Sequence, residues 1–410
     1  MNTIEKPSLM PHLNLPKIFP LLVSLSVLSI CAMVPDCLFA QRNSDSDMPR
    51  QPHESWEQIA PFFSPPAAYK NQYGEYRSPL LFEDGKRVRN KRAWEKRRVE
   101  IRDKWHGLMG TWPEINQLPA FEILETIEKE GFWQKKIAFD WVPGQRTTGY
   151  LLIPFGASKY PAVITVYYEP ETAAGLGRPD LPDRDFALQL TQRGFVTLSL
   201  GTTESTLNQT YSIYYPSIDE AQVEPLSMLA YAAATSWHVL AQQPEVDPDR
   251  IGIMGHSYGG KWAMFASCLY DKFVAAAWSD PGIVFQQDRP SINYWEPWYL
   301  GYHPPPWRKR GMPEADNPAV GLYPILLEKG LDLHELHALM APRPFLVSGG
   351  SEDPVERWIP LNHSVEVNKL LGYTHRVGMT NRSDHAPNAA SNAVIVDFFS
   401  YFLLLESHTR

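Results

Sequence analysis

The sequence predicts an α/β protein with a mostly parallel sheet and helices on both of its faces. Three observations indicate this class. From about residue 132 onward, short apolar runs typical of buried strands alternate with helix-forming stretches. One such run, Ile251–Met254, ends in a Gly-x-Ser-x-Gly motif that leads directly into a helix. Acidic residues and a histidine follow later strands, at the carboxyl edge of the sheet where the sites of such folds lie.

The first forty residues have the pattern of a secretory signal. Lys6 and Lys17 precede an apolar run of about 17 residues, Ile18–Val34, and Ala40 offers a cleavage site before Gln41. An uncleaved membrane anchor is the alternative, because a run of this length is near the minimum that spans a bilayer. We expect an exported protein, periplasmic or extracellular, that touches a membrane only if this signal stays uncleaved.

Composition limits which partners and cofactors the chain is expected to have. The chain has 410 residues, of which 44% are hydrophobic, and a net charge of −8, so no general attraction to nucleic acid is implied. Without residues 1–40, only Cys268 of the three cysteines remains, and a single thiol forms no internal disulfide. His and Cys show no metal-ligand spacing. We therefore expect neither a metal nor another cofactor.

Residues 41–131 are predicted to form a linker and a helical extension. Residues 41–80 are polar and rich in proline, whereas residues 86–109 carry apolar side chains near helical spacing. This helix has a basic cluster that either grips an anionic polymer or forms the solvated face of a helix packed on the main domain. The cluster comprises Lys86, Arg87, Arg89, Lys91, Arg92, Lys96, Arg97 and Arg98.

The main domain is expected over residues 132–410, where each strand and helix has its own signal. Phe132–Val142 and Thr147–Pro154 read as a hairpin around Pro-Gly-Gln. Further strands are expected at 161–168, 195–200, 251–254, 273–279, 344–350 and 375–380. Helices are expected at 186–193, 223–243, 261–270 and 388–405.

The Gly-x-Ser-x-Gly turn has the features of a nucleophile elbow. Ser257 would lie on a strained turn with its hydroxyl exposed, and side chains at Gly255 and Gly259 would collide with the neighbouring strand and helix. The helix that follows would direct its N-terminal N–H groups toward an oxyanion formed at the serine. The alternative is a glycine-rich strand–helix turn with an inert serine.

These motifs resemble those of the α/β-hydrolase superfamily, most specifically over Asp247–Gly260. Gly-His-Ser-Tyr-Gly-Gly is similar to the nucleophile motif of the prolyl oligopeptidase family and of acetyl xylan esterase-type hydrolases. Asp332–Pro344 and the Gly-x-Ser-x-x-Gly-Lys spacing resemble bacterial carbohydrate esterases, particularly glucuronoyl esterases. The chain departs from the latter at Tyr258, where glucuronoyl esterases carry an arginine.

In this superfamily the catalytic residues follow the order nucleophile, acid, histidine. Ser257 is then the nucleophile and His385 the general base, because it is the only one of twelve histidines just beyond the final predicted strand. We expect Asp353 as the acid, in a Gly/Ser/Pro-rich loop after a late strand. Asp280 is the alternative acid, since some glucuronoyl esterases place a glutamate at the end of that earlier strand; an aspartate there is expected to be too short to reach His385.

An oxyanion hole needs two hydrogen-bond donors. The elbow supplies the N–H of Tyr258, and the second is expected at Tyr168, in the loop after the strand Val163–Val166; a tyrosine hydroxyl could serve instead, as in the prolyl oligopeptidase family. The resemblance to glucuronoyl esterases implies that Lys261 contacts substrate hydroxyls. A surface lysine in the first turn of a helix is the alternative.

A lid is expected at about residues 283–335, because this stretch is longer than a single connection needs. Trp295 and Trp298 could stack on sugar rings or aromatic acyl groups of a substrate. They could equally pack in the lid's own small core.

Together these features predict an exported serine hydrolase that cleaves small-molecule or polysaccharide esters through a Ser-His-Asp acyl-enzyme mechanism. A prolyl oligopeptidase-like peptidase is the first alternative. The roughly 90 residues between Gln41 and Phe132 argue against it, because they are too few for the β-propeller of that family. A non-enzymatic carbohydrate-binding module is the second alternative.

Overall fold

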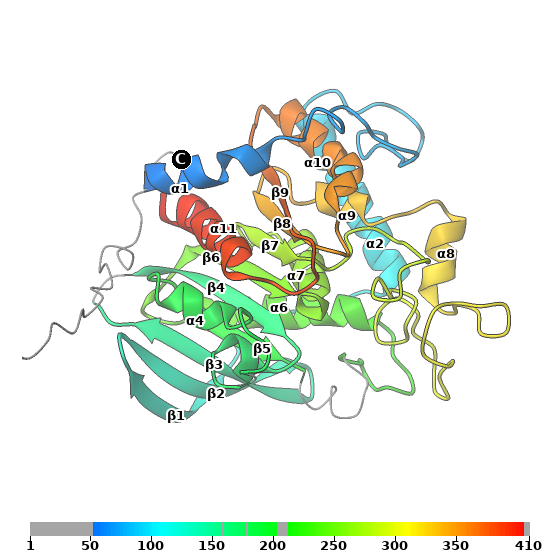
Figure 1. Cartoon of the computed structure of the whole chain (residues 1–410). Coiled ribbons are helices and arrows are strands. Elements are labelled where there is room, and N and C mark those ends of the chain that lie inside the picture. Colours follow the sequence, from blue (N-terminus) through cyan, green and yellow to red (C-terminus); the bar gives the residue numbers. More distant parts are fainter. Residues whose placement is uncertain (1–51, 157–158, 178, 203–211, 406–410) are drawn as a thin grey trace, which may run out of the picture. The chain divides into compact units, whose positions relative to one another are not determined.

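The computed structural model describes residues 52–156, 159–177, 179–202 and 212–405 (Figure 1). The signal segment predicted for residues 1–40 lies outside these residues. Residues 47–410 form one compact unit, so the extension predicted N-terminal to the main domain belongs to the same unit as that domain. Within the described ranges, no helix combines the length and the apolar character needed to cross a bilayer.

A nine-stranded sheet is the centre of this unit, with the strand order β1-β2-β3-β5-β4-β6-β7-β8-β9. Strands β1, β2, β3 and β5 pair antiparallel in sequence, whereas β5, β4, β6, β7, β8 and β9 are parallel to one another. The parallel part brings the carboxyl ends of six neighbouring strands to one edge. The strands are β1 Phe121–Lys129, β2 Phe132–Val142, β3 Gln145–Pro154, β4 Tyr160–Tyr167, β5 Val196–Gly201, β6 Val246–His256, β7 Ala276–Ser279, β8 Phe345–Gly349 and β9 Val377–Asn381.

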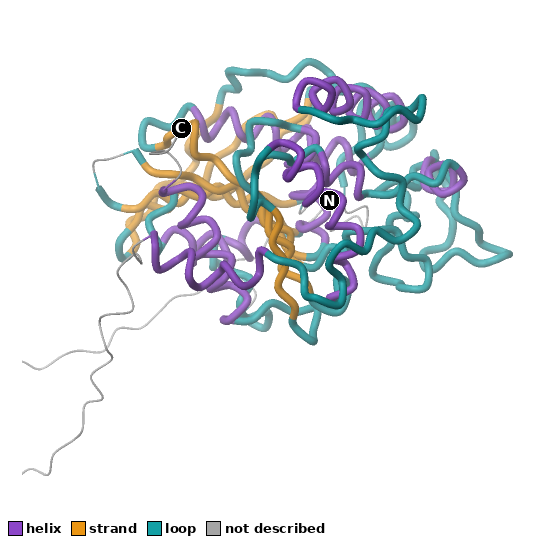
Figure 2. The backbone as a smooth tube through the Cα atoms, turned by 90° about the horizontal axis from the view of Figure 1, so that it is seen from above, coloured by secondary structure: helices purple, strands orange, loops and turns teal. Residues whose placement is uncertain are grey.

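Helices cover both faces of the sheet, as Figures 1 and 2 show. Helices α6 and α7 pack on one face, and α4 and α11 pack on the other, where α1 lies against α11. Short helical turns span Ala60–Phe63, Val355–Arg357 and Ser400–Leu405. The helices are α1 Pro52–Ile59, α2 Lys91–Met109, α3 Pro170–Ala173, α4 Phe186–Thr191, α6 Pro225–Ala241, α7 Tyr258–Leu269, α8 Leu322–Glu328, α9 His334–Ala338, α10 Trp358–Leu371 and α11 Ala389–Phe399.

Strand β6 shows why its apolar run predicted a strand buried on both faces. Ile251 and Ile253 belong to the large core that includes α6 and α7, whereas Met254 belongs to a second core formed with α11. Successive side chains of a strand point to opposite faces, so both faces need apolar residues here. The predicted fold class, a mostly parallel sheet with helices on both faces, is confirmed.

The structure adds one strand that the sequence did not indicate. Strand β1 is an edge strand with no buried residue, and its charged residues conceal the apolar alternation that marks a strand. It pairs with β2 from Phe121 to Lys129. The sheet therefore begins eleven residues before the main-domain boundary predicted at Phe132 (132 − 121).

Helix α2 confirms the helix predicted in the extension. Asn90 caps its N-terminus by accepting a hydrogen bond from the backbone N–H of Ala93. Within the basic cluster, Arg97 is fully buried and its Nη2 lies 3.1 Å from Glu335 of α9. Arg98 is 2.6 Å from Asp271. These members of the cluster hold α2 against the rest of the unit by ion pairs.

Candidate active site

Ser257 occupies a strained turn between β6 and α7. Its backbone has φ 57° and ψ −115°, outside the regions favoured by non-glycine residues. A Cβ at Gly259 would lie 1.9 Å from the carbonyl oxygen of Val166, and one at Gly255 would lie 2.1 Å from that of Gly259. Only glycine fits these positions, as the sequence predicted, and the tight approach fixes Ser257 in a conformation that costs on the order of 1–3 kcal/mol.

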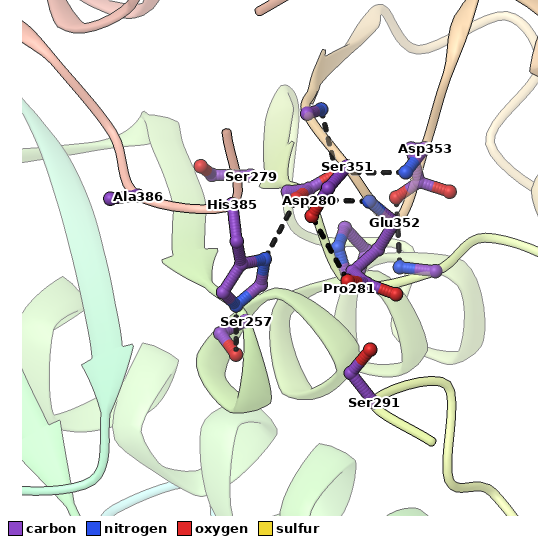
Figure 3. Close-up of polar contacts among 12 residues, drawn as sticks. Ser257, Ser279, Asp280, Pro281, Ser291, Ser351, Glu352, Asp353, His385 and Ala386 are labelled. Atoms are coloured by element: carbon purple, nitrogen blue, oxygen red, sulfur yellow. Dashed lines mark hydrogen bonds and ion pairs between the residues drawn. The ribbon is translucent and has the colours of Figure 1, made fainter. Parts of the chain in front are cut away.

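The hydroxyl of Ser257 lies within hydrogen-bond distance of a histidine that is itself held by a carboxylate (Figure 3). His385 Nε2 is 2.8 Å from Ser257 Oγ. Its Nδ1 is 2.7 Å from Oδ2 of Asp280, a fully buried residue directly after β7. This geometry suits transfer of a proton from the hydroxyl to the imidazole.

The prediction that Asp353 contacts His385 is wrong, and the alternative position, Asp280, makes this contact. Asp280 has φ 51°, so the chain turns sharply at the end of β7 and brings even this short carboxylate beside the imidazole. The Asp353 carboxylate lies on the far side of Asp280 in Figure 3. It accepts hydrogen bonds from the backbone N–H groups of Gly282, at 2.8 Å, and Ile283, at 2.7 Å.

The two aspartates support each other through the backbone. Asp280 Oδ1 accepts from the N–H of Gly350 at 2.6 Å and from that of Asp353 at 2.8 Å. Burial, together with the nearby charge of Asp280, raises the pKa of Asp353 above its usual range. The signal that could have identified Asp280 is its place immediately after the strand, in a Ser-Asp-Pro-Gly turn.

His256 precedes the nucleophile but makes a different set of contacts. Its ring is buried 4.7 Å from that of His385, and its Nδ1 lies 3.1 Å from Ser279 Oγ. Burial first, and then the positive charges of its surroundings, lower its pKa well below the usual value. A neutral His256 forms part of the wall behind His385.

Tyr258 and Tyr168, predicted to supply the oxyanion hole, lie beside each other. Tyr258 is the first residue of α7, and Tyr168 directly follows β4. Their rings stack at 4.9 Å, and the Tyr258 hydroxyl is 2.9 Å from Thr202 Oγ1. Burial raises the pKa of Tyr258, which keeps its phenol neutral. Their roles as oxyanion donors stay a prediction.

Lys261 is neither the surface lysine nor the free substrate ligand that the sequence suggested. It is 3% exposed, and its Nζ donates to the carbonyl oxygens of Pro281, at 2.6 Å, and Ser291, at 3.3 Å. The ammonium also lies 5.0 Å from the centre of the Tyr294 ring. Burial lowers its pKa to about 8. Lys261 therefore anchors the turn that follows Asp280.

The two tryptophans predicted to stack on a substrate are buried instead. Trp295 has no exposed surface, and its indole N–H donates to the carbonyl oxygen of Gly311 at 2.9 Å. Trp298 is 4% exposed and lies beneath the Arg310 guanidinium, 5.2 Å from the ring centre. Both rings belong to the large core that also contains α6 and α7, rather than to a small core of the lid's own.

The described ranges contain no group of three or more His, Cys, Asp or Glu side chains placed to hold a metal ion.

Comparison with known proteins agrees with this geometry. A sequence profile of the prolyl oligopeptidase family (peptidase S9) matches residues 232–326, which include the elbow and α7. No curated protein sequence matches the chain.

Solved structures of esterases are similar over most of the chain. A glucuronoyl esterase from Solibacter usitatus aligns with a TM-score of 0.63 at 16% identity, covering 80% of this chain and 97% of its own. A promiscuous esterase of carbohydrate esterase family 15 from a marine bacterial metagenome aligns at 0.58 and 15% identity, covering 83% and 100%. A putative acetyl xylan esterase from Bacteroides fragilis aligns at 0.51 and 18% identity, covering 77% and 80%. The chain therefore has the α/β-hydrolase fold.

Proposed function

We propose that this chain is a serine hydrolase that cleaves carboxylic esters through an acyl-enzyme. The array of Ser257 Oγ, His385 and Asp280 carries the proposal, with contacts of 2.8 Å and 2.7 Å on the two sides of the imidazole. A nucleophile, a base and an orienting acid in this order define the chemistry of acyl transfer.

The proposed mechanism gives each group a step. His385 Nε2 takes the proton of Ser257 as Oγ attacks the ester carbonyl carbon, and the imidazolium then gives that proton to the departing alkoxide. The Asp280 carboxylate fixes the tautomer with the proton on Nδ1 and stabilises the imidazolium. Water attacks the resulting acyl-enzyme by the same route, with His385 as base, and releases the acid and the free serine.

The proposed substrates are esters on polysaccharides. The protein would encounter them outside the cytoplasm, after export directed by a signal in residues 1–40. Support comes from the solved structures that align over about four fifths of the chain, which are named as a glucuronoyl esterase, a promiscuous esterase of carbohydrate esterase family 15 and a putative acetyl xylan esterase. The match of residues 232–326 to the prolyl oligopeptidase family favours a peptidase as the second candidate.

A substrate panel tests the two candidates against each other. It contains acetylated xylan, a benzyl glucuronate ester, a short-chain nitrophenyl ester and an Ala-Pro anilide. We expect turnover of at least one ester and much slower cleavage of the anilide. Faster cleavage of the anilide than of every ester would establish the peptidase instead.

Ser257→Ala tests the mechanism on the same panel. We expect at least ~10³-fold loss of kcat, with the fold retained, because removing the nucleophile of a triad has effects of this size or larger. A fluorophosphonate probe should label the wild type and not the variant. A folded variant that keeps a tenth of the wild-type kcat would contradict the assignment of Ser257.

A further inference from the structure

Arg382 binds the turn that carries the proposed general base. It directly follows β9 and precedes His385 by three residues. Its Nη2 donates to the carbonyl oxygen of His385 at 2.7 Å, and its Nε donates to that of Ala386 at 2.8 Å. One guanidinium thus binds two successive carbonyl groups immediately after the imidazole-bearing Cα.

The same guanidinium joins this turn to two neighbouring strands. Its Nη1 donates to the carbonyl oxygen of Ser348 in β8 at 2.8 Å and is 3.1 Å from Ser348 Oγ. Its Nη2 is 3.3 Å from the hydroxyl of Ser279, the last residue of β7. Ser279 immediately precedes Asp280, so Arg382 links the base directly to the element that carries its acid.

The histidine turn needs such a link because little else covers it. His385 has 35% of its side chain exposed, and Ser383 and Asp384 beside it are exposed. Segments of this kind open easily unless hydrogen bonds hold them. The planar fork of an arginine can bind several carbonyls in fixed directions, which the single ammonium of a lysine cannot do.

We propose that Arg382 is a positioning residue for catalysis, which keeps His385 between Ser257 and Asp280 by holding the backbone of its turn. The inference rests on the proposed hydrolase function. Arg382 touches backbone and serine hydroxyl groups behind the imidazole, so its removal should act on kcat more than on KM. A displacement of about 1 Å in a catalytic group can reduce the rate on the order of 10²-fold.

Arg382→Ala is the first test, assayed on the best ester of the panel. We expect kcat to fall on the order of 10²-fold, KM to change less than about threefold, and fluorophosphonate labelling of Ser257 to slow by the same factor as kcat. Millimolar guanidinium chloride should restore part of the kcat of this variant by filling the vacated position. Sodium chloride at equal concentration should restore none.

Arg343 offers a matched control at the opposite ends of the strands. It also binds backbone carbonyls, those of Ser267 at 2.9 Å, Phe273 at 2.8 Å and Leu339 at 3.1 Å, but it precedes β8 rather than following β9. Arg343→Ala should lower the melting temperature, retain the kcat of the folded enzyme and show no response to guanidinium. A loss of kcat equal in the two variants would overturn the proposal.

Two further outcomes separate this inference from the proposed function. A wild type that cleaves no ester and resists the fluorophosphonate probe would refute the hydrolase function itself. An active wild type whose kcat differs from that of Arg382→Ala by less than about threefold would refute only the role of Arg382.

If Arg382→Ala does not fold, Arg382→Lys takes its place. A kcat near that of the wild type would refute the need for the guanidinium fork, and a large loss of kcat in a folded protein would support it.

Discussion

The loops after β7 and β8 both contain an Asp-Pro dipeptide, but only one of the two aspartates contacts the histidine of the candidate site. Each contains an aspartate followed by proline, Asp280 in one and Asp353 in the other, and both carboxylates are fully buried. Only Asp280 contacts His385. Asp353 instead binds backbone N–H groups of the β7 loop, while the β8 loop donates its own N–H groups to Asp280.

The position along each loop explains this difference. Asp280 is the first residue after its strand and turns left-handed there, which directs the carboxylate along the edge of the sheet to the imidazole. Asp353 lies four residues beyond Gly349 (353 − 349), and its carboxylate lies on the far side of Asp280 from His385 (Figure 3). The comparison indicates that one aspartate contacts the histidine, whereas the loop of the other supports that carboxylate.

The largest expected effect comes from Asp280→Asn. This change retains the shape of the side chain but removes the charge that fixes the His385 tautomer, and the corresponding change in the best-studied triad lowers kcat by about 10⁴-fold. We expect a similar loss here, measured as kcat on the best ester. Asp353→Asn is the matched control and should lose far less. The reverse order, in two folded variants, would return the assignment to Asp353.

An intermediate effect is expected for Asp353→Ala, and mainly on stability. Its carboxylate accepts the N–H groups of Gly282 and Ile283, and a buried donor left without a partner costs about 1–3 kcal/mol. Urea unfolding should therefore show a lower free energy of unfolding. Turnover should fall by about tenfold or less, because the N–H of residue 353 still binds Asp280.

Asp353→Asn tests whether Asp353 acts by accepting these two backbone hydrogen bonds. An asparagine oxygen can still accept one of the two bonds, so it should recover part of the stability lost in the alanine variant. If Asp353→Ala lost as much kcat as Asp280→Asn while unfolding at the wild-type urea concentration, Asp353 would be more than a support.

The elements that the sequence predicted are those whose signals are local. The elbow depends on Gly255 and Gly259, whose close contacts involve adjacent elements, and its sequence alone predicted the turn. Strand β6 and helix α7 were likewise marked by apolar runs. His385 was found because it follows the last strand, a position that the chain order specifies.

What the sequence could not give depends on contacts between distant loops. The choice between Asp280 and Asp353 depends on a left-handed φ at Asp280 and on how far each aspartate lies from the end of its strand. Neither has a signature in residue type. Neither interpretation of Lys261, a substrate contact or a surface lysine, anticipated its burial, because its partners, the carbonyls of Pro281 and Ser291, lie 20 and 30 residues away. The residue type of Trp295 does not tell whether its ring is buried or exposed to a substrate.

Lys261 provides the smallest expected effect, and it concerns the turn that holds Asp280. Its ammonium is buried against the carbonyl oxygen of Pro281, and burial lowers its pKa from 10.5 to about 8. Below pH 8 the lysine is charged in both the folded and the unfolded chain, so it adds no pH dependence to stability. Between about pH 8 and pH 10.5 the folded protein has released the proton while the unfolded chain still binds it.

The free energy of unfolding of the wild type should therefore gain a contribution that rises with pH in this window, by up to about 1.4 kcal/mol per pH unit for one proton. Lys261→Met removes the titrating group and should remove this contribution, so urea unfolding at intervals from pH 7 to pH 10 should show the difference between the two proteins growing above pH 8. Lys369→Met is the control, since the side chain of Lys369 is 73% exposed and its removal should leave the pH dependence unchanged. Parallel curves for the wild type and Lys261→Met would mean that the pKa of Lys261 is alike in the folded and unfolded states, and would contradict the lowered pKa.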